Sequence, residues 1–540
     1  MTATDQIRAE LLRAARSLGA PEGTDPVIER PRDTAHGDWA TNLPMVLARP
    51  LGKKPREIAD LLRDSMNLAG AGVAKIDIAG PGFMNFWLDP AYVAGVLEAI
   101  IEQDEEYGAS DVGQGRPVNV EFVSANPTGP LHVGHGRQAA LGDAISTLLE
   151  FTGWKVTREF YYNDAGVQID NLAASVEARR GEIRGEEAAI PEGGYHGEYI
   201  REIAEQYVKS SDGLTVREFA VRALRKEQDL DLQAFGVRFD NYFLESSLYT
   251  DGLVDETVTA LSNSGMTYEH EGALWLRTTA FGDDKDRVMR KGDGTYTYFV
   301  PDVAYHLTKW KRGYRRAIDV QGADHHSTVT RVRAGLQALE MGAAPDYPEY
   351  VLHQMVTVMK GGEEVKISKR AGSYVTVRDL INEVGRDAVR YFFLMRKSDS
   401  QLVFNVDLAA SQSEDNPVYY VQMAHARMCG IFRVGEIDRE SFSLNGVALD
   451  VLREQEEQEL LKALGDFPEL VESAAASLEP HRIASYLVET ARLAHLWYHK
   501  HHVLEQEESV TRARLALARG AQIVIRNGLR ILGITTPERM

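Results

Sequence analysis

The stretch that most constrains the fold lies between residues 118 and 153, where a strand pattern runs directly into a helix pattern. Val118, Val120 and Phe122 occupy alternate positions, which predicts a strand with two different faces. Proline and glycine interrupt the chain over residues 127–130, and apolar residues then recur at helical spacing up to a glycine stop signal. A strand, a tight loop and a helix in this order favour an α/β fold.

The same order of elements returns further along the chain. Residues 155–162 are strand-like, and a second strand pattern at 317–321 is followed by a turn at 322–324 and a helical pattern at 328–341. Alternating strands and helices predict a Rossmann-type, doubly wound parallel sheet. The charged, largely helical stretch at about 171–285 is interpreted as an insertion between the two halves of that sheet.

The length indicates several domains, because 540 residues exceed what one hydrophobic core usually supports. Residues 1–110 have the patterns of a small α+β module, with two helices and a hairpin. The α/β pattern occupies residues 111–400. Beyond it the patterns are almost entirely helical, which predicts an all-α domain over residues 401–540.

The composition narrows the functional classes. Cys429 is the single cysteine, which excludes an internal disulfide and a cysteine-rich zinc site. No signal-peptide pattern opens the chain, and no apolar run approaches the roughly 20 residues of a membrane helix, so we expect a cytoplasmic protein. A formal net charge of −20 argues mildly against a nucleic-acid partner, although a local basic stripe can still hold a phosphate backbone.

The loop SANPTGPLHVGHGR, residues 124–137, is the first candidate site. It lies where a strand ends and a helix begins, and the unpaired N–H groups of a helix start favour phosphate. His132 and His135 could donate hydrogen bonds to phosphate oxygens there, while Gly134 and Gly136 would let a nucleotide approach the backbone. A metal pair or a simple helix cap are the alternative interpretations.

The second candidate is the segment GGEEVKISKRAG, residues 361–372. Lys366, Lys369 and Arg370 lie in it with glycine on both flanks. Cations on such a loop beside a nucleotide site could close on a departing pyrophosphate. Taken alone, a short basic loop is more often solvated surface.

Together the two segments resemble the signature pair of the class I aminoacyl-tRNA synthetases, with HVGH in place of HIGH and KISKR in place of KMSKS. The surrounding residues are similar to those of the arginyl-tRNA synthetases in particular. The similarity is carried by EFVSANPTGPLHVGHGR (121–137), YYNDAG (161–166), GADHH (322–326), DAVRYFFL (387–394), PERM (537–540), GDWATN (37–42) and GPGFMNFWL (80–88).

The resemblance implies an ATP-dependent ligase that activates L-arginine to its adenylate and then transfers it to the 3′ end of tRNA(Arg). It implies a tRNA-binding N-terminal module, a Rossmann catalytic domain and a helical anticodon-binding domain. The partners would be ATP with Mg²⁺, L-arginine and tRNA(Arg), with no membrane and no tightly bound metal, and we expect a monomer. Rival interpretations are another class I adenylate-forming enzyme, such as a cysteinyl or glutamyl one, and a non-catalytic tRNA-binding paralogue.

The resemblance also assigns the nucleotide site. It implies that the catalytic residues are His132, His135, Lys366 and Lys369. The ATP-binding residues would be Pro127, Gly129, His132, Gly134, His135 and Lys369. Because the substrate carboxylate is already ionised, such a reaction needs positioning and charge stabilisation rather than a protein base.

A guanidinium substrate must meet carboxylates, ideally in a planar fork. By position, the resemblance assigns arginine binding to Glu121, Asn126, Tyr298, Asp302 and Asp324. Glu121 is expected on the strand face opposite the apolar residues, and Asp302 follows a strand-like run at 295–301. As alternatives, Asp302 could complement a helix N-terminus and Glu121 could be an ordinary edge residue. Whether Asp324 would contact arginine or the ribose stays open.

The last helical pattern carries a row of arginines. Arg512, Arg519 and Arg526 recur every seven residues, so they should form one stripe that could contact tRNA phosphates. A solvated helix face is the alternative interpretation.

Overall fold

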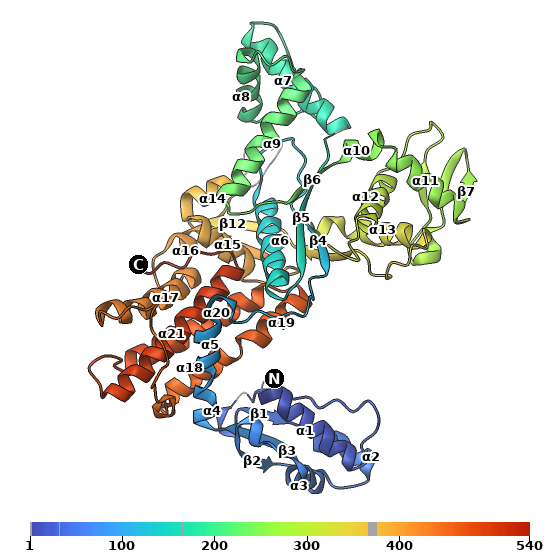
Figure 1. The fold of residues 1–540 in the computed structure, drawn as a ribbon. Helices are drawn as coiled ribbons and strands as arrows, with labels where there is room; N and C mark the ends of the chain where they lie inside the picture. Colours follow the sequence, from blue (N-terminus) through green and yellow to red (C-terminus); the bar gives the residue numbers. More distant parts are fainter. Residues whose placement is uncertain (1–2, 32, 165, 366–374) are drawn as a thin grey trace. The chain divides into compact units, whose positions relative to one another are not determined.

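The computed structural model describes residues 3–31, 33–164, 166–365 and 375–540 (Figure 1). The chain forms two compact units, each described here by itself. The first unit comprises Met1–Glu105, Met428–Asp466 and Arg492–Val524. The second unit comprises Glu106–Arg427, Phe467–Ala491 and Ile525–Met540.

The first unit contains a small sheet covered by helices. Its strands β1 (Trp39–Thr41), β3 (Phe83–Leu88) and β2 (Val73–Ala79) pair antiparallel in that order. Helices α1 (Ala3–Ser17), α2 (Leu43–Leu51) and α3 (Pro55–Ser65) contribute apolar side chains to one core with the sheet, including Ile7, Leu47, Leu62 and Phe86. The helix and hairpin patterns of this region are therefore confirmed. Two further helices, α4 (Pro90–Ala94) and α5 (Val96–Gln103), follow β3.

The second unit contains the parallel sheet that the sequence predicts. Its strand order is β11 (Glu349–His353), β10 (Arg316–Gly322), β4 (Pro117–Glu121), β5 (Lys155–Tyr162) and β6 (Asn241–Leu244), and every neighbouring pair is parallel. The chain proceeds outward from β4 in one direction and from β10 in the other. The carboxyl ends of β4 and β10 therefore flank the switch point, where ligands bind in sheets of this type.

The two faces of β4 receive different partners. Helix α6 (Val133–Phe151) packs on the face that carries Phe122, so closely that a methyl group on Gly142 would lie 2.1 Å from Cγ of Phe122. On the opposite face, Lys309 of helix α12 (Phe299–Lys311) reaches the carboxylate of Glu121. The predicted alternation of this strand is therefore confirmed.

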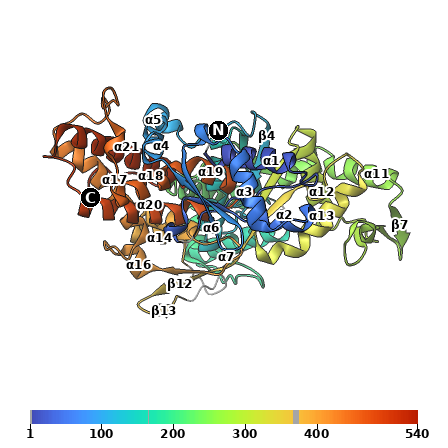
Figure 2. The ribbon, with the colours of Figure 1, turned by 90° about the horizontal axis from the view of Figure 1, so that it is seen from below.

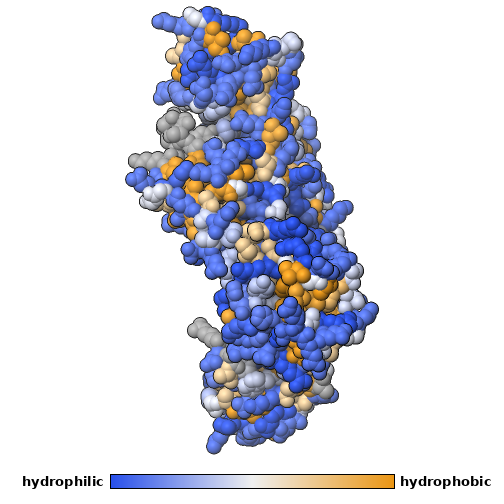
Figure 3. Space-filling view, turned by 90° about the vertical axis from the view of Figure 1, so that its left-hand side faces the viewer, coloured by the Kyte–Doolittle hydropathy of each residue, from blue (hydrophilic) through white to orange (hydrophobic). Residues whose placement is uncertain are grey.

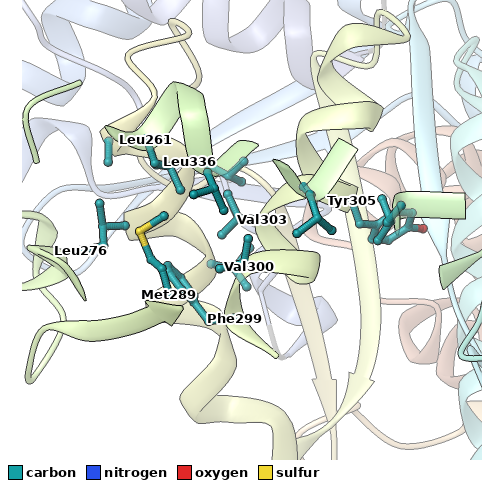
Figure 4. Close-up of a cluster of buried hydrophobic side chains, with 14 of the residues drawn as sticks. Leu261, Leu276, Met289, Phe299, Val300, Val303, Tyr305 and Leu336 are labelled. Carbon is teal, nitrogen blue, oxygen red and sulfur yellow. The ribbon is translucent and has the colours of Figure 1, made fainter. Parts of the chain in front are cut away.

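Helix α12 and helix α13 (His326–Ala338) share a core with a small antiparallel sheet, β7 (Thr267–His270), β8 (Ala273–Leu276) and β9 (Arg287–Arg290). Figure 4 shows Phe299, Val300 and Val303 of α12 beside Leu276 and Met289 of that sheet. This core fixes the first turn of α12, which carries Asp302.

The stretch from 171 to 285 differs from the expectation of a largely helical insertion. Its helices are α7 (Val167–Ile183), α8 (Glu198–Lys209), α9 (Val216–Ala234), α10 (Glu245–Thr250) and α11 (Leu253–Asn263), but β6 joins the main sheet and β7 and β8 form another. The strand expected over 295–301 is also absent as such: Tyr296 makes only an isolated bridge to Arg290, and α12 begins at Phe299. Strands β6, β7 and β8 are each four residues long, which is too short for an alternating pattern to distinguish a strand from a loop.

A third small sheet, β13 (Glu363–Glu364), β12 (Val356–Lys360) and β14 (Leu402–Asn405), lies beside α16 (Val406–Ala410), as Figure 2 shows. Helices α14 (Val377–Val384) and α15 (Arg386–Leu394) precede β14. The helical end of the chain consists of α17 (Pro417–Val434), α18 (Gln455–Gly465), α19 (Phe467–Ser477), α20 (His481–Lys500) and α21 (Glu508–Ile531), which confirms the helical pattern. Short 3₁₀ helices occur at Thr34–His36, Ala69–Ala71, Asp104–Glu106, Thr278–Phe281, Ala323–His325 and Leu449–Val451.

On the face that Figure 3 shows, hydrophilic residues cover most of the surface and hydrophobic residues form small, separate patches. Among the described residues, none of the helices combines the length and the apolar composition that crossing a bilayer requires.

Candidate active site

The two signature histidines cap the start of α6 reciprocally. Nδ1 of His132 accepts the backbone N–H groups of Gly134 (3.1 Å) and His135 (3.4 Å), and Nδ1 of His135 accepts the backbone N–H of His132 (3.4 Å). The two rings stack with their centroids 3.7 Å apart. Because both Nδ1 atoms accept hydrogen bonds, the proton of each neutral ring is on Nε2, where it can be donated to a ligand.

The histidines line a cavity of about 540 Å³. The cavity lies beyond β4 and β10, between the loop that precedes α6 and the residues that follow β10. The predicted residues that line it are Asn126, Gly129, His132, Gly134, His135 and Asp324. Pro127 is buried in the same loop and is not among the residues that line the cavity.

The loop between β4 and the histidines is held under backbone strain. Val123 and Ser124 have φ angles of 69° and 42°, and the left-handed region costs a β-branched residue such as Val123 on the order of 1–3 kcal/mol. Ser124 Oγ donates to Glu121 (2.8 Å) and accepts the backbone N–H of Tyr161 (3.3 Å), which stabilises the turn. The turn directs Asn126 into the cavity.

Asn126 is fixed from two neighbouring helices. Its side-chain amide donates to Gln168 of α7 (2.6 Å), and its backbone carbonyl accepts from Gln228 of α9 (3.0 Å). Gln228 also donates to the carbonyl of Gly129 (2.8 Å) and is fully buried. The insertion therefore holds the loop that carries the proposed substrate contacts.

Glu121 ends β4 and belongs to a buried ion network. Lys309 Nζ lies 2.6 Å from Glu121 and 2.7 Å from Asp319 of β10, and none of the Lys309 side chain is exposed. Burial disfavours the charged ammonium, but the carboxylates of Asp319 and Glu121 outweigh it and raise the pKa of Lys309 above its usual range. Next to this network, Glu159 forms a bidentate pair with Arg312, at 2.5 and 2.8 Å.

Asp302 faces a surplus of negative charge. Burial raises its pKa to about 7, and the neighbouring carboxylates of Glu245 and Glu121 add to the effect. Burial also raises the pKa of Glu245, and the negative charge of Asp164 adds to this increase. Such an acidic group, close to a carboxylate already bound by Lys309, can accept one further cation.

Two other predicted arginine-binding residues are exposed. The side chain of Tyr298, which the resemblance implies as an aromatic wall of the arginine pocket, is 81 % exposed and lies just before the first turn of α12. Its role as the aromatic wall of the arginine pocket stays a prediction. Asp324 lines the cavity and is exposed, 3.6 Å from His325.

Lys366 and Lys369 lie outside the described residues. The chain that follows them is anchored at the histidine loop: the backbone N–H of Val377 donates to Leu131 (2.9 Å), and Thr376 forms a bridge with His132.

Several residues of the site carry no signal in the sequence. Lys309 reads as a surface lysine on an amphipathic helix, and Glu245 follows a four-residue strand with no motif around it. Gln168 and Gln228 lie 42 and 102 residues from the loop that they hold. Only the three-dimensional fold brings them to the loop.

The arginine stripe on α21 is not continuous. Arg519 is 4 % exposed, and its guanidinium pairs with Glu440 (3.2 Å) and Asp104 (3.4 Å) within the first unit. The prediction of a single exposed stripe is therefore wrong at Arg519, because this side of the helix is buried and the charge is neutralised there. Arg512 and Arg526 are partly exposed.

Family models match most of the chain. The model described as "Arginyl tRNA synthetase N terminal domain" matches residues 2–88, "tRNA synthetases class I (R), catalytic domain" matches 96–428, and "DALR anticodon binding domain" matches 421–540. An arginine–tRNA ligase of Geotalea daltonii is 56 % identical over 97 % of this chain and 96 % of its own length. That of Geotalea uraniireducens is 53 % identical over 99 % of both chains.

Solved structures described as arginyl-tRNA synthetases have the same fold as this chain. A Campylobacter jejuni structure described as an arginyl-tRNA synthetase is 29 % identical, with a TM-score of 0.77 over 84 % of this chain and 100 % of its own. The arginyl-tRNA synthetase of Thermus thermophilus, at 23 % identity, shares the fold with a TM-score of 0.76 over 99 % of both chains. These relatives show an ATP-dependent ligase that acts on arginine and tRNA, and the chain belongs to the arginyl-tRNA synthetase family of class I.

Proposed function

We propose that both steps of arginine–tRNA ligation take place in the crevice at the carboxyl ends of β4 and β10. The triphosphate of ATP would lie at the start of α6, where His132 and His135 donate from Nε2. The guanidinium of arginine would lie between Glu121 and Asp302, with its α-amino group on Asn126. Tyr298 and Asp324 would close over the bound substrates from the exposed rim.

The observation that carries this proposal is the charge around Asp302. Burial and the charges of Glu245 and Glu121 raise the pKa of this carboxyl group to about 7, and among the described residues they outweigh the opposing charge of Arg331. Lys309 is already held by Glu121 and Asp319, so it does not offset the charge of Asp302. A planar, always-charged guanidinium suits the two acids better than any other common amino-acid side chain.

In the first step, a carboxylate oxygen of arginine attacks the α-phosphorus of ATP. The bond from the α-phosphorus to the bridging oxygen breaks, and pyrophosphate leaves. His132 and His135 would stabilise the charge that develops on the phosphate oxygens, and Lys366 and Lys369 would offset the charge of the leaving pyrophosphate. Mg²⁺ would arrive with ATP, because phosphate oxygens are its preferred ligands.

In the second step, the terminal ribose hydroxyl of tRNA(Arg) attacks the carbonyl of the adenylate, and AMP leaves. Residues 1–110 would contact the tRNA, and residues 401–540 would bind its anticodon, a role that the match to an anticodon-binding model supports. Arg512 and Arg526 would contact tRNA phosphates. The proposed contacts with ATP and arginine all come from the second unit of one chain, which supports a monomer, and we place the enzyme in the cytoplasm, where tRNA and ATP are found.

The test is ATP–pyrophosphate exchange and arginylation with purified enzyme, with and without tRNA(Arg). The wild type should exchange pyrophosphate with arginine and with no other amino acid. Asp302→Asn should raise the KM for arginine about 10²-fold or more, the effect of removing a charged partner, while the KM for ATP changes less than about threefold. Equal effects on both constants would contradict the assignment of Asp302.

A further inference from the structure

Three carboxylates form a row across the centre of the main sheet, called here the acid row. In the strand register, Glu121 of β4 lies beside Asp319 of β10 on one side and beside Glu159 of β5 on the other. All three side chains are buried. Like charges this close disfavour one another's ionised form, so a buried row of acids needs cations.

Helix α12 supplies fewer cations than the acid row has carboxylates. Lys309 Nζ lies between two of them, 2.6 Å from Glu121 and 2.7 Å from Asp319. Arg312, at the end of α12, binds the third acid with both of its terminal nitrogens. His306 lies 3.4 Å from Asp319, but burial and the charge of Lys309 lower the pKa of its imidazole to about 3, so the ring is neutral. Within the part of the chain that the structure describes, three acids therefore have two cations as ion-pair partners.

Glu159 is the fully compensated member of the acid row. Burial opposes its ionisation, but Arg312 and Lys309 outweigh burial and lower the pKa of Glu159 to about 2. The side-chain amide of Asn241 donates to the same carboxylate at 2.6 Å. The unmatched negative charge therefore belongs to the other two acids, which share one ammonium group.

Of these two acids, Glu121 is the one at the proposed arginine pocket. Its Oε2 accepts from Lys309 and its Oε1 accepts the hydroxyl of Ser124 at 2.8 Å, so both oxygens of the carboxylate have a fixed direction. Its charge acts on Asp302, in the first turn of α12. Lys309 lies about two turns further along this helix, so one element carries both Asp302 and the cation that holds Glu121.

We propose that Lys309 is a positioning residue for the activation of arginine. It fixes the direction of Glu121 and offsets one of the two charges of Glu121 and Asp319, which leaves the acid row one cation short. The guanidinium of the substrate supplies that cation. Because none of the Lys309 side chain is exposed, Lys309 acts through Glu121 without touching arginine. The inference rests on the function proposed above, in which Glu121 and Asp302 bind the guanidinium.

The test compares Lys309→Met, Asp319→Asn and the double variant with Lys311→Met as the matched control. Lys311 lies on the same turn of α12, is exposed and pairs with Glu256 at 3.3 Å, so its variant removes an identical charge that does not face the acid row. ATP–pyrophosphate exchange in the presence of tRNA(Arg) gives the KM for arginine and the KM for ATP at neutral pH.

Lys309→Met should raise the KM for arginine about 10-fold or more, because Glu121 loses a buried ionic partner, and should change the KM for ATP less than about threefold. Asp319→Asn should also raise the KM for arginine, since Lys309 then offsets Glu121 alone. The double variant restores one unmatched charge, so its KM for arginine should be lower than that of either single variant. Lys311→Met should change neither constant.

The pH profile separates positioning from a purely structural role. In Lys309→Met, a proton takes the place of the ammonium between the two facing acids and leaves only at high pH. The ratio of the KM for arginine of this variant to that of the wild type should therefore fall between about pH 8 and about pH 9. The ratio for Lys311→Met should stay constant. The other titratable and charged groups around the two acids are the same in every variant: Glu159, Glu245, Asp302, Tyr305, His306, Arg312, Arg331, Tyr347 and Tyr350.

Three results would overturn the inference: a KM for arginine in Lys309→Met within about threefold of the wild type, equal increases in both Michaelis constants, or a ratio that does not change with pH. If Lys309→Met does not fold, the other two variants decide, and a KM for arginine in the double variant above that of Asp319→Asn would overturn it. Failure of the proposed function would appear separately, as a wild-type enzyme that does not exchange pyrophosphate in the presence of arginine.

Discussion

At the scale of single residues, the site is organised around charges that differ in how well they are compensated. Glu121 has Lys309 as its partner at 2.6 Å, and Glu159 has Arg312. Burial raises the pKa of Asp302 to about 7, and the charges of Glu245 and Glu121 add to this effect more than Arg331 opposes it. In the proposed complex, the guanidinium of arginine would offset the charge of Asp302.

The affinity for arginine should therefore depend on pH. Below about pH 7 the carboxyl of Asp302 is neutral in the free enzyme, and a bound guanidinium must first displace its proton. The dissociation constant of arginine should thus rise roughly fivefold between pH 7 and pH 6, and by little between pH 8 and pH 7. Calorimetry over this range measures it, with ATP binding as the control. A constant affinity for arginine from pH 8 to pH 6 would contradict the role of Asp302.

Asp302→Asn should stabilise the free enzyme. The pKa of Asp302 is higher in the folded state than in the unfolded state. The free energy of unfolding therefore falls as the pH rises from about 4 to about 7, and this loss of stability reaches its full size above pH 7. At pH 8 the amide should therefore raise the free energy of unfolding by about 1–3 kcal/mol, a gain that shrinks as the pH falls towards 4. Thermal unfolding measures this, with Asp346→Asn, an exposed aspartate of the second unit, as the matched control. A lower Tm at pH 8 would count against it.

At the scale of elements, the contact between α6 and β4 fixes the position of the histidines. Gly142 allows the approach, because a methyl group there would lie 2.1 Å from the ring of Phe122. Arg137, in the second turn of α6, is buried and donates to the carbonyls of Gln354, Lys397 and Ser400, which anchors the same helix at its start.

Gly142→Ala should destabilise the second unit by about 1–3 kcal/mol, the usual cost of overpacking a dense core. It should also lower kcat for pyrophosphate exchange, because α6 must move away from the strand that carries Glu121. Gly292→Ala is the control, since the nearest atom to its methyl group would lie 3.5 Å away. The double variant with Phe122→Leu should recover part of the stability in denaturant unfolding. If Gly142→Ala unfolds at the same denaturant concentration as the wild type, the contact between residue 142 and the ring of Phe122 is not tight.

The elements that the sequence predicts well are those with long, regular patterns. Strand β4, helix α6 and strand β10 follow from alternation and helical spacing, and so does the side of β4 on which Glu121 lies. Strand β6 and the sheet of β7, β8 and β9 do not, because four residues are too few to show a period. The motif around His132 predicts a nucleotide site, but no pattern in the sequence places Lys309 beside Glu121 or Glu245 beside Asp302, which only the fold brings together.

At the scale of the whole molecule, the first unit consists of three separate chain segments. Arg519 contacts all three, because it lies in the last segment and pairs with Asp104 of the first and Glu440 of the second. Its burial explains why a regular spacing of seven did not indicate an exposed binding stripe.

Arg519→Leu should lower the stability of the first unit by about 1–3 kcal/mol and leave the salt dependence of tRNA binding unchanged, because the lost interactions are internal. Arg512→Leu, at a partly exposed position of the same helix, is the matched control and should have the smaller effect on stability. Thermal unfolding and anisotropy in a salt series measure the two properties. A flatter salt dependence for Arg519→Leu would restore Arg519 to the tRNA contacts.

The three-segment construction of the first unit also sets an order of events on the ribosome. Helix α5 finds its neighbours on α18 and α21, and Leu97 of α5 packs against Gly520. These partners are translated more than 300 residues after α5 itself. During most of the synthesis of the chain, the apolar side chains of α5 therefore remain exposed. If the nascent chain is released early, these side chains stay accessible to chaperones and proteases.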